Sequence, residues 1–199
     1  YACYVSKFLK YDLPVYALES NEEFCKDIEK SASLSDIKNI EIINAVLSDK
    51  EENLYVYDVG VVNPSKIDNK KEDEKEYLDK VSKFGKQSQT ITMDKLFQNK
   101  KHVPNILKMD VHGAEGKILN GANNLLNNNI DYILMEMHTE NDLDKFSPGF
   151  TKSKIIQNLI DHNFNCYLIS PHSDGFRNLF APSNETQKLY LKNINKLKY

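Results

Sequence analysis

The chain has 199 residues and a formal net charge of -3 at pH 7, and 40% of its residues are hydrophobic. This length suits one domain with a substantial core, so we predict a single domain over residues 1–199. Its lysines and arginines are scattered, which argues against nucleic acid as the main partner, and no apolar run reaches the roughly 18 residues that a membrane span needs.

Three cysteines, Cys3, Cys25 and Cys166, lie far apart among apolar residues. An odd number of separated cysteines is typical of reduced thiols, so we predict an intracellular, cytoplasmic protein. Apolar spacing predicts a helix over residues 1–10. Because the sequence starts inside this helix and without methionine, we expect that residues before Tyr1 are missing.

A predicted strand over residues 15–19 ends in Glu19, and Ser20-Asn-Glu-Glu23 has the pattern of a capping box that starts a helix. An acid at this point accepts hydrogen bonds from the two hydroxyls of a ribose in nucleotide-binding α/β sheets. The ordinary alternative is a surface carboxylate beside a helix start.

The next segment is predicted as two strands of a hairpin, over residues 39–47 and 53–57. Residues 60–88 lose apolar character and contain a mixed charge run, so we expect an exposed, partly ordered insertion there. A strand over residues 89–93 and a short helix over residues 94–99 follow.

The central stretch, residues 105–121, is an apolar run that acquires charge, turns at Gly113 and continues as an amphipathic helix through Leu126. The apolar run suits a parallel strand that is covered on both faces. Charges in such a strand need partners or a function, which singles out Lys108 and Asp110. We therefore expect Asp110 at the carboxyl end of a central strand.

A second apolar run, residues 130–138, ends in Glu136 and His138. Ligands bind at the carboxyl ends of strands in open α/β sheets, so we expect Asp110, Glu136 and His138 to share one edge and to open into a pocket together with Glu19. An ion pair between Lys108 and Glu136 is the structural alternative.

The last third begins with a second polar insertion over residues 139–150, after which Thr151 caps a helix. Residues 165–169 and 177–181 are predicted as an antiparallel pair of strands, and residues 184–197 as an amphipathic helix. This alternation of elements indicates a mostly parallel, doubly wound α/β sheet with a reversed last strand.

Five segments carry a resemblance to a known family: Leu18-Glu-Ser-Asn21, Asn44-Ala-Val-Leu-Ser-Asp49, Thr92-Met-Asp94, Leu107-Lys-Met-Asp-Val-His-Gly-Ala-Glu115 and Met135-Glu-Met-His138. In this order they resemble the successive motifs of FkbM-type S-adenosylmethionine-dependent methyltransferases, and the resemblance covers most of residues 1–181. It implies a class I, Rossmann-like methyltransferase fold. Two features depart from the family: His112 replaces a glutamate, and the first strand with its glycine-rich cofactor loop is absent.

The resemblance also implies a cofactor, S-adenosylmethionine, and a site for it. Residues expected to contact the cofactor are Glu19, Ser20, Asn44, Ala45 and Asp110. An alcohol must shed its proton as it attacks a methyl group, and His138, with an ordinary pKa near 6.5, is the expected base. Asp110 then lies beside the cofactor or shares the base role, and Glu136 orients His138.

The function that follows is O-methylation of a hydroxyl on a small molecule, expected to be a sugar or glycan. His112 adds an imidazole to the set, and a divalent metal is possible there, but the spacing is not diagnostic and we assign no metal ligand. Three alternatives stay open. They are a nicotinamide-dependent oxidoreductase, a non-catalytic binding domain with a degenerate methyltransferase fold, and a metal-dependent O-methyltransferase.

Overall fold

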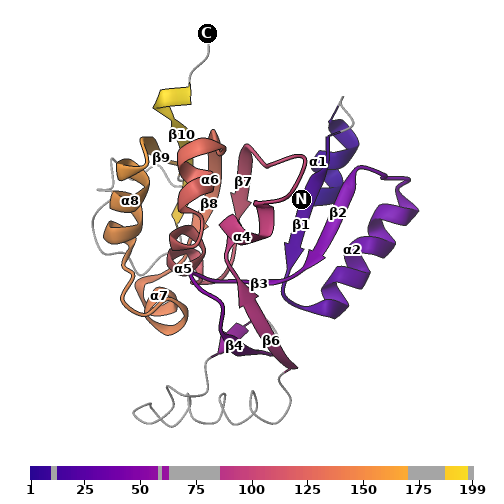
Figure 1. Ribbon diagram of the computed structural model, residues 1–199, viewed down its shortest axis with the longest axis horizontal. Helices are drawn as coiled ribbons and strands as arrows, with labels where there is room; N and C mark the ends of the chain where they lie inside the picture. Colours follow the sequence, from indigo (N-terminus) through magenta and orange to yellow (C-terminus); the bar gives the residue numbers. More distant parts are fainter. Residues whose placement is uncertain (10–12, 58–59, 63–85, 170–186, 197–199) are drawn as a thin grey trace. The chain divides into compact units, whose positions relative to one another are not determined.

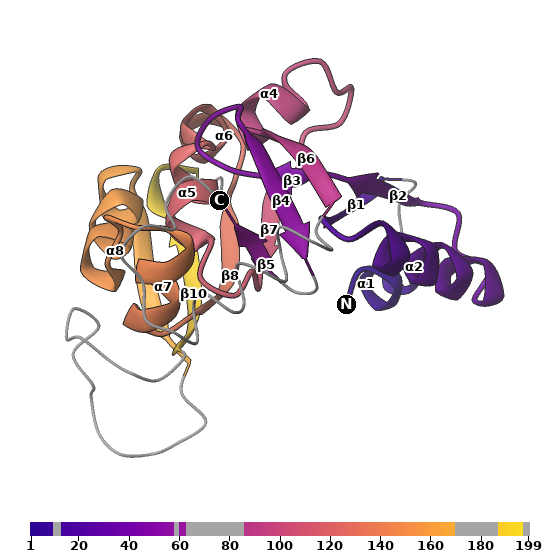
Figure 2. The ribbon, with the colours of Figure 1, turned by 90° about the horizontal axis from the view of Figure 1, so that it is seen from below.

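The computed structural model describes residues 1–9, 13–57, 60–62, 86–169 and 187–196. The chain forms two compact units, the first from residues 1–47 and 51–91 and the second from residues 48–50 and 92–199. Both units combine helices with strands, as Figure 1 and Figure 2 show from two directions. None of the described helices has the length and apolar character to cross a membrane.

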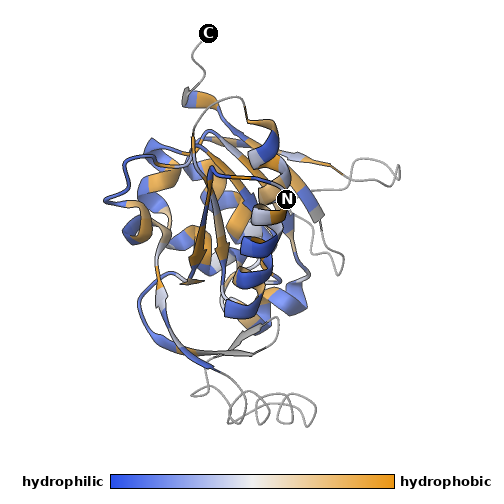
Figure 3. Ribbon diagram, turned by 90° about the vertical axis from the view of Figure 1, so that its right-hand side faces the viewer, coloured by the Kyte–Doolittle hydropathy of each residue, from blue (hydrophilic) through white to orange (hydrophobic). Residues whose placement is uncertain are grey.

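The first unit begins with α1 (Ala2–Phe8), β1 (Val15–Glu19), α2 (Glu22–Leu34) and β2 (Ile40–Asn44). β1 and β2 pair in parallel and in register, so both strands end at the same edge. The buried residues of α2 are Cys25 and Ala32, and the side of the helix that faces the viewer in Figure 3 is mostly hydrophilic.

The cap of α2 lies one residue later than predicted. The side chain of Asn21 accepts the hydrogen bond from the backbone N–H of Glu23, at 2.9 Å. The Ser20 hydroxyl instead donates to the carboxylate of Glu19, at 3.3 Å. The Ser20 side chain, which the capping-box pattern assigned to the helix start, therefore binds Glu19 at the end of β1.

A second sheet of the first unit has the strand order β3-β6-β4-β5. Its members are β3 (Val46–Leu47), β4 (Asn53–Tyr57), β5 (Gly60–Val62) and β6 (Lys86–Ile91). The hairpin predicted for residues 39–47 and 53–57 is wrong, because β6 lies between β3 and β4 and the hairpin partner of β4 is β5. The predicted insertion contributes β5 and the first half of β6, and its residues 63–85 lie outside the described residues.

The second unit starts with α4 (Met93–Phe97), capped by Thr92, and is built on a sheet with the order β7-β8-β10-β9. Its strands are β7 (Ile106–Met109), β8 (Tyr132–Met137), β9 (Phe164–Leu168) and β10 (Gln187–Asn193). β7 and β8 are parallel, and β10 runs antiparallel to both β8 and β9. The last described strand is therefore reversed relative to β8 and β9, but the reversed strand that was predicted, residues 177–181, lies outside the described residues.

Three helices lie along one face of this sheet in Figure 1 and Figure 2: α5 (Glu115–Asn120), α6 (Asn123–Asn128) and α8 (Lys152–Asp161). The apolar core of the unit includes the fully buried side chains Leu126, Ile133, Met135, Met137, Ile156, Leu159, Leu189 and Leu191. Burial of each such side chain contributes roughly 1.5–3 kcal/mol, so the β8 and β10 strands are firmly held.

The helix predicted to follow Gly113 is two helices, because the chain breaks at Gly121 and Ala122 between α5 and α6. A side chain at Gly121 would place its Cβ 2.2 Å from the backbone oxygen of Ser48. The Gly121 carbonyl also accepts a hydrogen bond from the N–H of Asp94, at 3.0 Å. Close backbone packing from two other segments therefore ends α5 here.

The polar insertion predicted for residues 139–150 contains a helix, α7 (Glu140–Phe146). Thr139 and Asp142 form a reciprocal capping box that starts it, and Leu143 is fully buried. The helix after Thr151 is confirmed as α8, and Asn163, shortly after its end, has a left-handed conformation, with φ of 66°.

The helix predicted over residues 184–197 is wrong where the structure describes it, because residues 187–193 form β10. Leu189 and Leu191 alternate with polar neighbours and are fully buried, which suits a strand. Its backbone pairs with β8 on one side and β9 on the other. The strand predicted over residues 177–181 lies outside the described residues.

The α/β class is confirmed, with parallel and antiparallel pairs mixed. The described strands are distributed over three sheets. A single, mostly parallel, doubly wound sheet of the methyltransferase type stays a prediction.

Candidate active site

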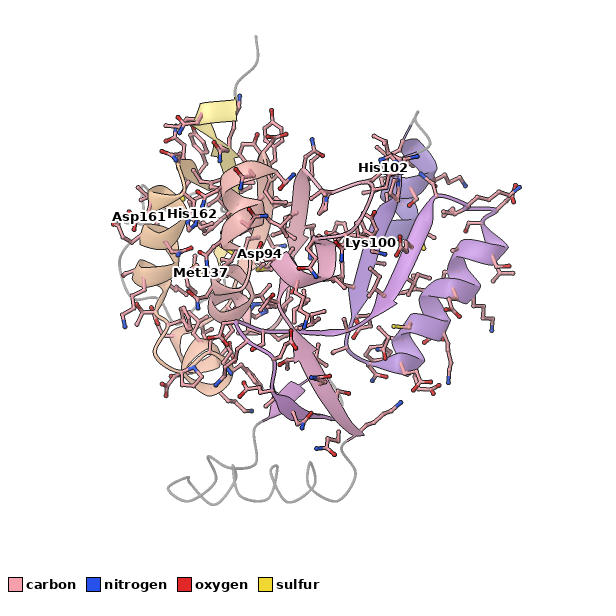
Figure 4. The ribbon with its side chains drawn as sticks, viewed as in Figure 1. Asp94, Lys100, His102, Met137, Asp161 and His162 are labelled. Carbon is pink, nitrogen blue, oxygen red and sulfur yellow. The ribbon has the colours of Figure 1, made fainter. Side chains whose placement is uncertain are left out.

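The ends of β7 and β8 bring together two of the predicted catalytic side chains. The strands pair in parallel, with Met109 opposite Met135, so Asp110 and His138 leave the sheet at the same edge. Figure 4 labels Met137, the last residue of β8, directly before His138. His138 Nε2 lies 3.8 Å from Asp110 Oδ1. The sequence-based expectation that these two side chains lie together is met.

A tight turn follows β7 and carries the chain into α5. His112 and Gly113 both have positive φ, of 51° and 99°. A Cβ at Gly113 would lie 2.5 Å from the backbone oxygen of Asp142, so only glycine fits there. The turn brings the ring of His112 to 4.7 Å, centroid to centroid, from the ring of His138.

Glu115, the first residue of α5, is fully buried and faces His138. Its Oε1 lies 2.6 Å from His138 Nδ1 and accepts a second hydrogen bond from the N–H of Gly113, at 3.3 Å. A buried carboxylate needs such partners. Its other oxygen, Oε2, has no hydrogen-bond partner within the described chain.

The sequence analysis assigned no contact with His138 to Glu115. The sequence nevertheless contained a signal for this contact. Glu115 follows the turn residue Gly113 by two positions and lies at the start of the predicted amphipathic helix. That spacing points the carboxylate back toward the strand ends.

The contact with Glu115 determines the chemistry of His138. The hydrogen bond to Glu115 raises the pKa of His138, and the charges of Glu115 and Asp110 add to this effect, whereas burial opposes it. In the neutral ring, Nδ1–H donates to Glu115, which leaves the lone pair on Nε2. Nε2 is the nitrogen that faces Asp110, so this edge of the sheet presents a basic nitrogen beside a carboxylate.

Asp110 is held as a carboxylate. Burial alone would raise the pKa of Asp110, but the hydrogen bond from Lys108 and the Lys108 charge outweigh burial and lower it. Lys108 Nζ lies 3.0 Å from Asp110 Oδ2, so Oδ1 is the oxygen that faces His138. The charged residue inside β7 therefore has a partner at the strand end.

Glu136 lies in a different environment from the other predicted catalytic residues. It pairs in register with Lys188 of β10, and their charged groups are 3.4 Å apart. Its side chain is 25% exposed, in contrast to the fully buried Met135 and Met137 on either side of it. Glu115, and not Glu136, therefore contacts His138 in the structure, and Glu136 forms an ion pair with Lys188 on the neighbouring strand.

The residues predicted to bind the cofactor in the first unit gather at the ends of β1 and β2. Glu19 Oε1 accepts hydrogen bonds from the N–H of Asn21, at 2.8 Å, and from the Ser20 hydroxyl. The Asn44 side chain donates to the carbonyls of Glu19 and Ser20, at 3.0 and 3.1 Å, and the Ala45 N–H donates to the Glu19 carbonyl. This leaves Glu19 Oε2 as an acceptor on a rigid turn.

These four residues belong to the first unit, and Asp110, Glu136 and His138 belong to the second. Their common pocket stays a prediction. Within the described chain, a group with the composition of a metal site consists of Asp110, His112 and His138.

Comparison with known proteins gives one family match. A family model described as the methyltransferase FkbM domain matches residues 3–166, which include every candidate site residue named above. No curated protein matches the chain. A solved structure, described as methyltransferase FkbM from Methylobacillus flagellatus KT, aligns with a TM-score of 0.49 and 12% sequence identity. The alignment covers 89% of this chain and 36% of the other, so this chain spans about a third of that protein's length.

Proposed function

Because the chain belongs to the FkbM methyltransferase family, we propose that it is an O-methyltransferase that uses S-adenosylmethionine. The observation that supports methyl transfer to an oxygen atom is the buried contact between Glu115 and His138. This contact leaves a basic nitrogen of His138 at a strand edge beside Asp110. The proposed acceptor is a hydroxyl of a small molecule, and the family resemblance favours a sugar or glycan.

The donor groups at the end of β1 fit the cofactor. Glu19 carries a carboxylate with one oxygen held by its own turn and the other available, which suits two ribose hydroxyls. Ser20, Asn44 and Ala45 line the same edge and would contact the adenosine part. Asp110, kept ionised by Lys108, would face the ammonium group of the methionine part.

The proposed base is His138. When bound, S-adenosylmethionine would supply a methyl group to the acceptor oxygen and would leave as S-adenosylhomocysteine. The hydroxyl proton passes to His138 Nε2, because Nδ1 already donates to Glu115. Glu115 and Asp110 then stabilise the imidazolium that forms. A positioned base of this kind contributes about 10²–10⁴-fold to a rate.

Glu115 is the positioning carboxylate in this proposal, in place of Glu136. A histidine that takes up a proton is most effective when its ring orientation and tautomer are held by a second group. The 2.6 Å contact from a fully buried side chain provides that restraint.

Calorimetry on the chain tests the cofactor. We expect heat on addition of S-adenosylmethionine and S-adenosylhomocysteine, and a loss of affinity of roughly 10- to 150-fold in Glu19→Gln, because a charge-assisted hydrogen bond contributes about 1.5–3 kcal/mol. Glu23→Gln, at the exposed second residue of α2, is the matched control and should bind as the unchanged chain does. Heat with NAD or NADP and none with S-adenosylmethionine would instead support an oxidoreductase. If no ligand of this set gave heat, the result would support a non-catalytic domain.

The reaction is tested by transfer of an isotopically labelled methyl group from S-adenosylmethionine to a panel of monosaccharides and other small alcohols. We expect labelled product from at least one alcohol, and a loss of at least a hundredfold in His138→Gln with cofactor binding unchanged. Unchanged transfer by His138→Gln would remove this residue from the mechanism.

A further inference from the structure

Three side chains at the ends of β7 and β8 converge in a way that proton transfer alone does not require. Asp110, His112 and His138 each present one donor atom, and these atoms all lie within 4.8 Å of one another. Asp110 and His112 are exposed, whereas His138 is buried. His138 is therefore fixed in the protein interior, whereas Asp110 and His112 are exposed on a side that a small ion can reach.

Glu115 arranges His138 in the manner of a metal ligand. Histidines that bind a metal ion almost always donate their other ring N–H to a carboxylate, a backbone carbonyl or a water molecule, which fixes the tautomer and strengthens the donor nitrogen. Glu115 holds Nδ1 at 2.6 Å, so the lone pair of Nε2 points toward Asp110. A fully buried carboxylate cannot be replaced by water in this role.

The backbone supplies a second, independent observation. His112 has a φ of 51°, a left-handed conformation that is uncommon for residues other than glycine, although asparagine, aspartate and histidine adopt it more often than the rest. Strained backbone of this kind gathers at functional sites, where the surrounding structure holds it. Here it carries the His112 ring to 4.7 Å from the His138 ring.

We propose that Asp110 Oδ1, His112 and His138 Nε2 bind one divalent transition-metal ion of the Zn²⁺ or Co²⁺ type. Two imidazoles and one carboxylate suit these ions, whereas Mg²⁺ and Ca²⁺ prefer oxygen donors. Lys108 occupies Asp110 Oδ2, so the carboxylate binds through one oxygen.

The geometry is close to what such an ion needs. Bonds of about 2.0–2.2 Å require donor atoms at most about 4.2 Å apart. The pair formed by Asp110 Oδ1 and His138 Nε2 meets this limit at 3.8 Å. The remaining separations are at most 4.8 Å, and the proposal requires a rotation of the exposed His112 ring to shorten them.

An ion at this position has a consequence that rests on the proposed function. His138 Nε2 cannot hold a metal ion and accept a proton at the same time. Bound Zn²⁺ would therefore inhibit methyl transfer, and a chelator would restore it.

Binding is tested on the chain after treatment with a chelator, without cofactor or acceptor. Co²⁺ titration followed by visible absorption should give one equivalent of bound ion, which Zn²⁺ displaces. His112→Asn, which keeps a residue that tolerates positive φ, should weaken binding at least tenfold. Asp110→Asn is a second variant with the same expected loss.

The matched control is His102→Asn. His102 is exposed and precedes β7, whereas the proposed site follows it, and Figure 4 labels it. It should bind as the unchanged chain does. No binding up to 100-fold molar excess of ion, or equal binding by His112→Asn and the unchanged chain, would overturn the proposal.

The two proposals fail separately. Metal binding is measured without S-adenosylmethionine, so a chain that binds Co²⁺ but not the cofactor keeps the metal site and loses the methyltransferase function. If methyl transfer is found, Zn²⁺ should slow it more in the unchanged chain than in His112→Asn. Transfer that rises with Zn²⁺ would overturn the inhibitory role.

Discussion

Glu115 Oε1 lies 2.6 Å from His138 Nδ1, although the two residues are 23 positions apart in the chain. The Glu115 side chain is fully buried. This contact joins the first turn of α5 to the end of β8. It fixes which ring nitrogen of His138 is available, and both proposals made for this edge of the sheet depend on that nitrogen.

The two glutamates near the site form a matched pair for mutation. Glu115→Gln should lower the pKa of His138, because its hydrogen bond and charge are the largest favourable influences on the imidazolium. Glu136→Gln should leave the pKa of His138 unchanged, because Glu136 pairs with Lys188. NMR titration of the His138 ring in the three chains, with a chelator present, measures this. Methyl transfer should fall by roughly 10–100-fold in Glu115→Gln alone. Identical His138 titrations in all three would refute the positioning role.

Stability should depend on pH through the same histidine. The pKa of His138 is raised in the folded protein, so the folded protein binds the proton more tightly than the unfolded chain. This contribution is fully present below the ordinary value of about 6.5 and is lost as pH rises through the folded pKa.

The measurement is urea unfolding of the unchanged chain and of His138→Gln, with a chelator present, at several pH values between about 6 and 9. The free energy of unfolding of the unchanged chain minus that of His138→Gln should decrease as pH rises. A difference that increases over this range would mean that the folded protein does not favour the charged ring.

The turn before α5 should tolerate no side chain at Gly113. Gly113→Ala places a Cβ 2.5 Å from backbone atoms of α7 at a positive φ, whereas Gly149→Ala, also at positive φ, meets nothing within 4 Å. Gly149→Ala should cost about 1 kcal/mol for its backbone conformation, and Gly113→Ala at least about 2 kcal/mol more for the clash. Thermal or urea unfolding distinguishes them, and equal losses would show that the turn does not pack against Asp142.

The end of the chain offers a test of strand against helix. Leu189 is fully buried in β10, whereas Ile194, which follows the strand, is 45% exposed. Leu189→Ala should therefore cost about 2–4 kcal/mol of unfolding free energy, and Ile194→Ala less than about 1 kcal/mol. An amphipathic helix through Tyr190 and Ile194 would give the opposite order.

The position of Asp110 and His138 was predictable because it follows from local rules. Each residue directly follows a short apolar run, and parallel strands connected through helices end at a common edge. The same local reasoning favoured Glu136 as the partner of His138, because side chains two positions apart lie on one face of a strand. The pairing of Glu136 with Lys188 of β10 follows only from the tertiary structure.

The tail was predicted wrongly because residues 187–193 fit both periodicities over so short a length. What decides between them is an available partner on each side. β8 and β9 provide two strand edges, and β10 fills the space between them. A pattern in one segment carries no information about edges that other segments leave open.

The amino-acid sequence by itself determined the α/β class, most helix and strand positions and the acid and imidazole that close β7 and β8, because these depend on residues near one another in the chain. Only the tertiary structure decided which carboxylate contacts His138 and that His112 joins it. Those contacts depend on how α5 packs against the end of β8 and on a turn held by α7, and such packing is a property of segments that meet only after folding.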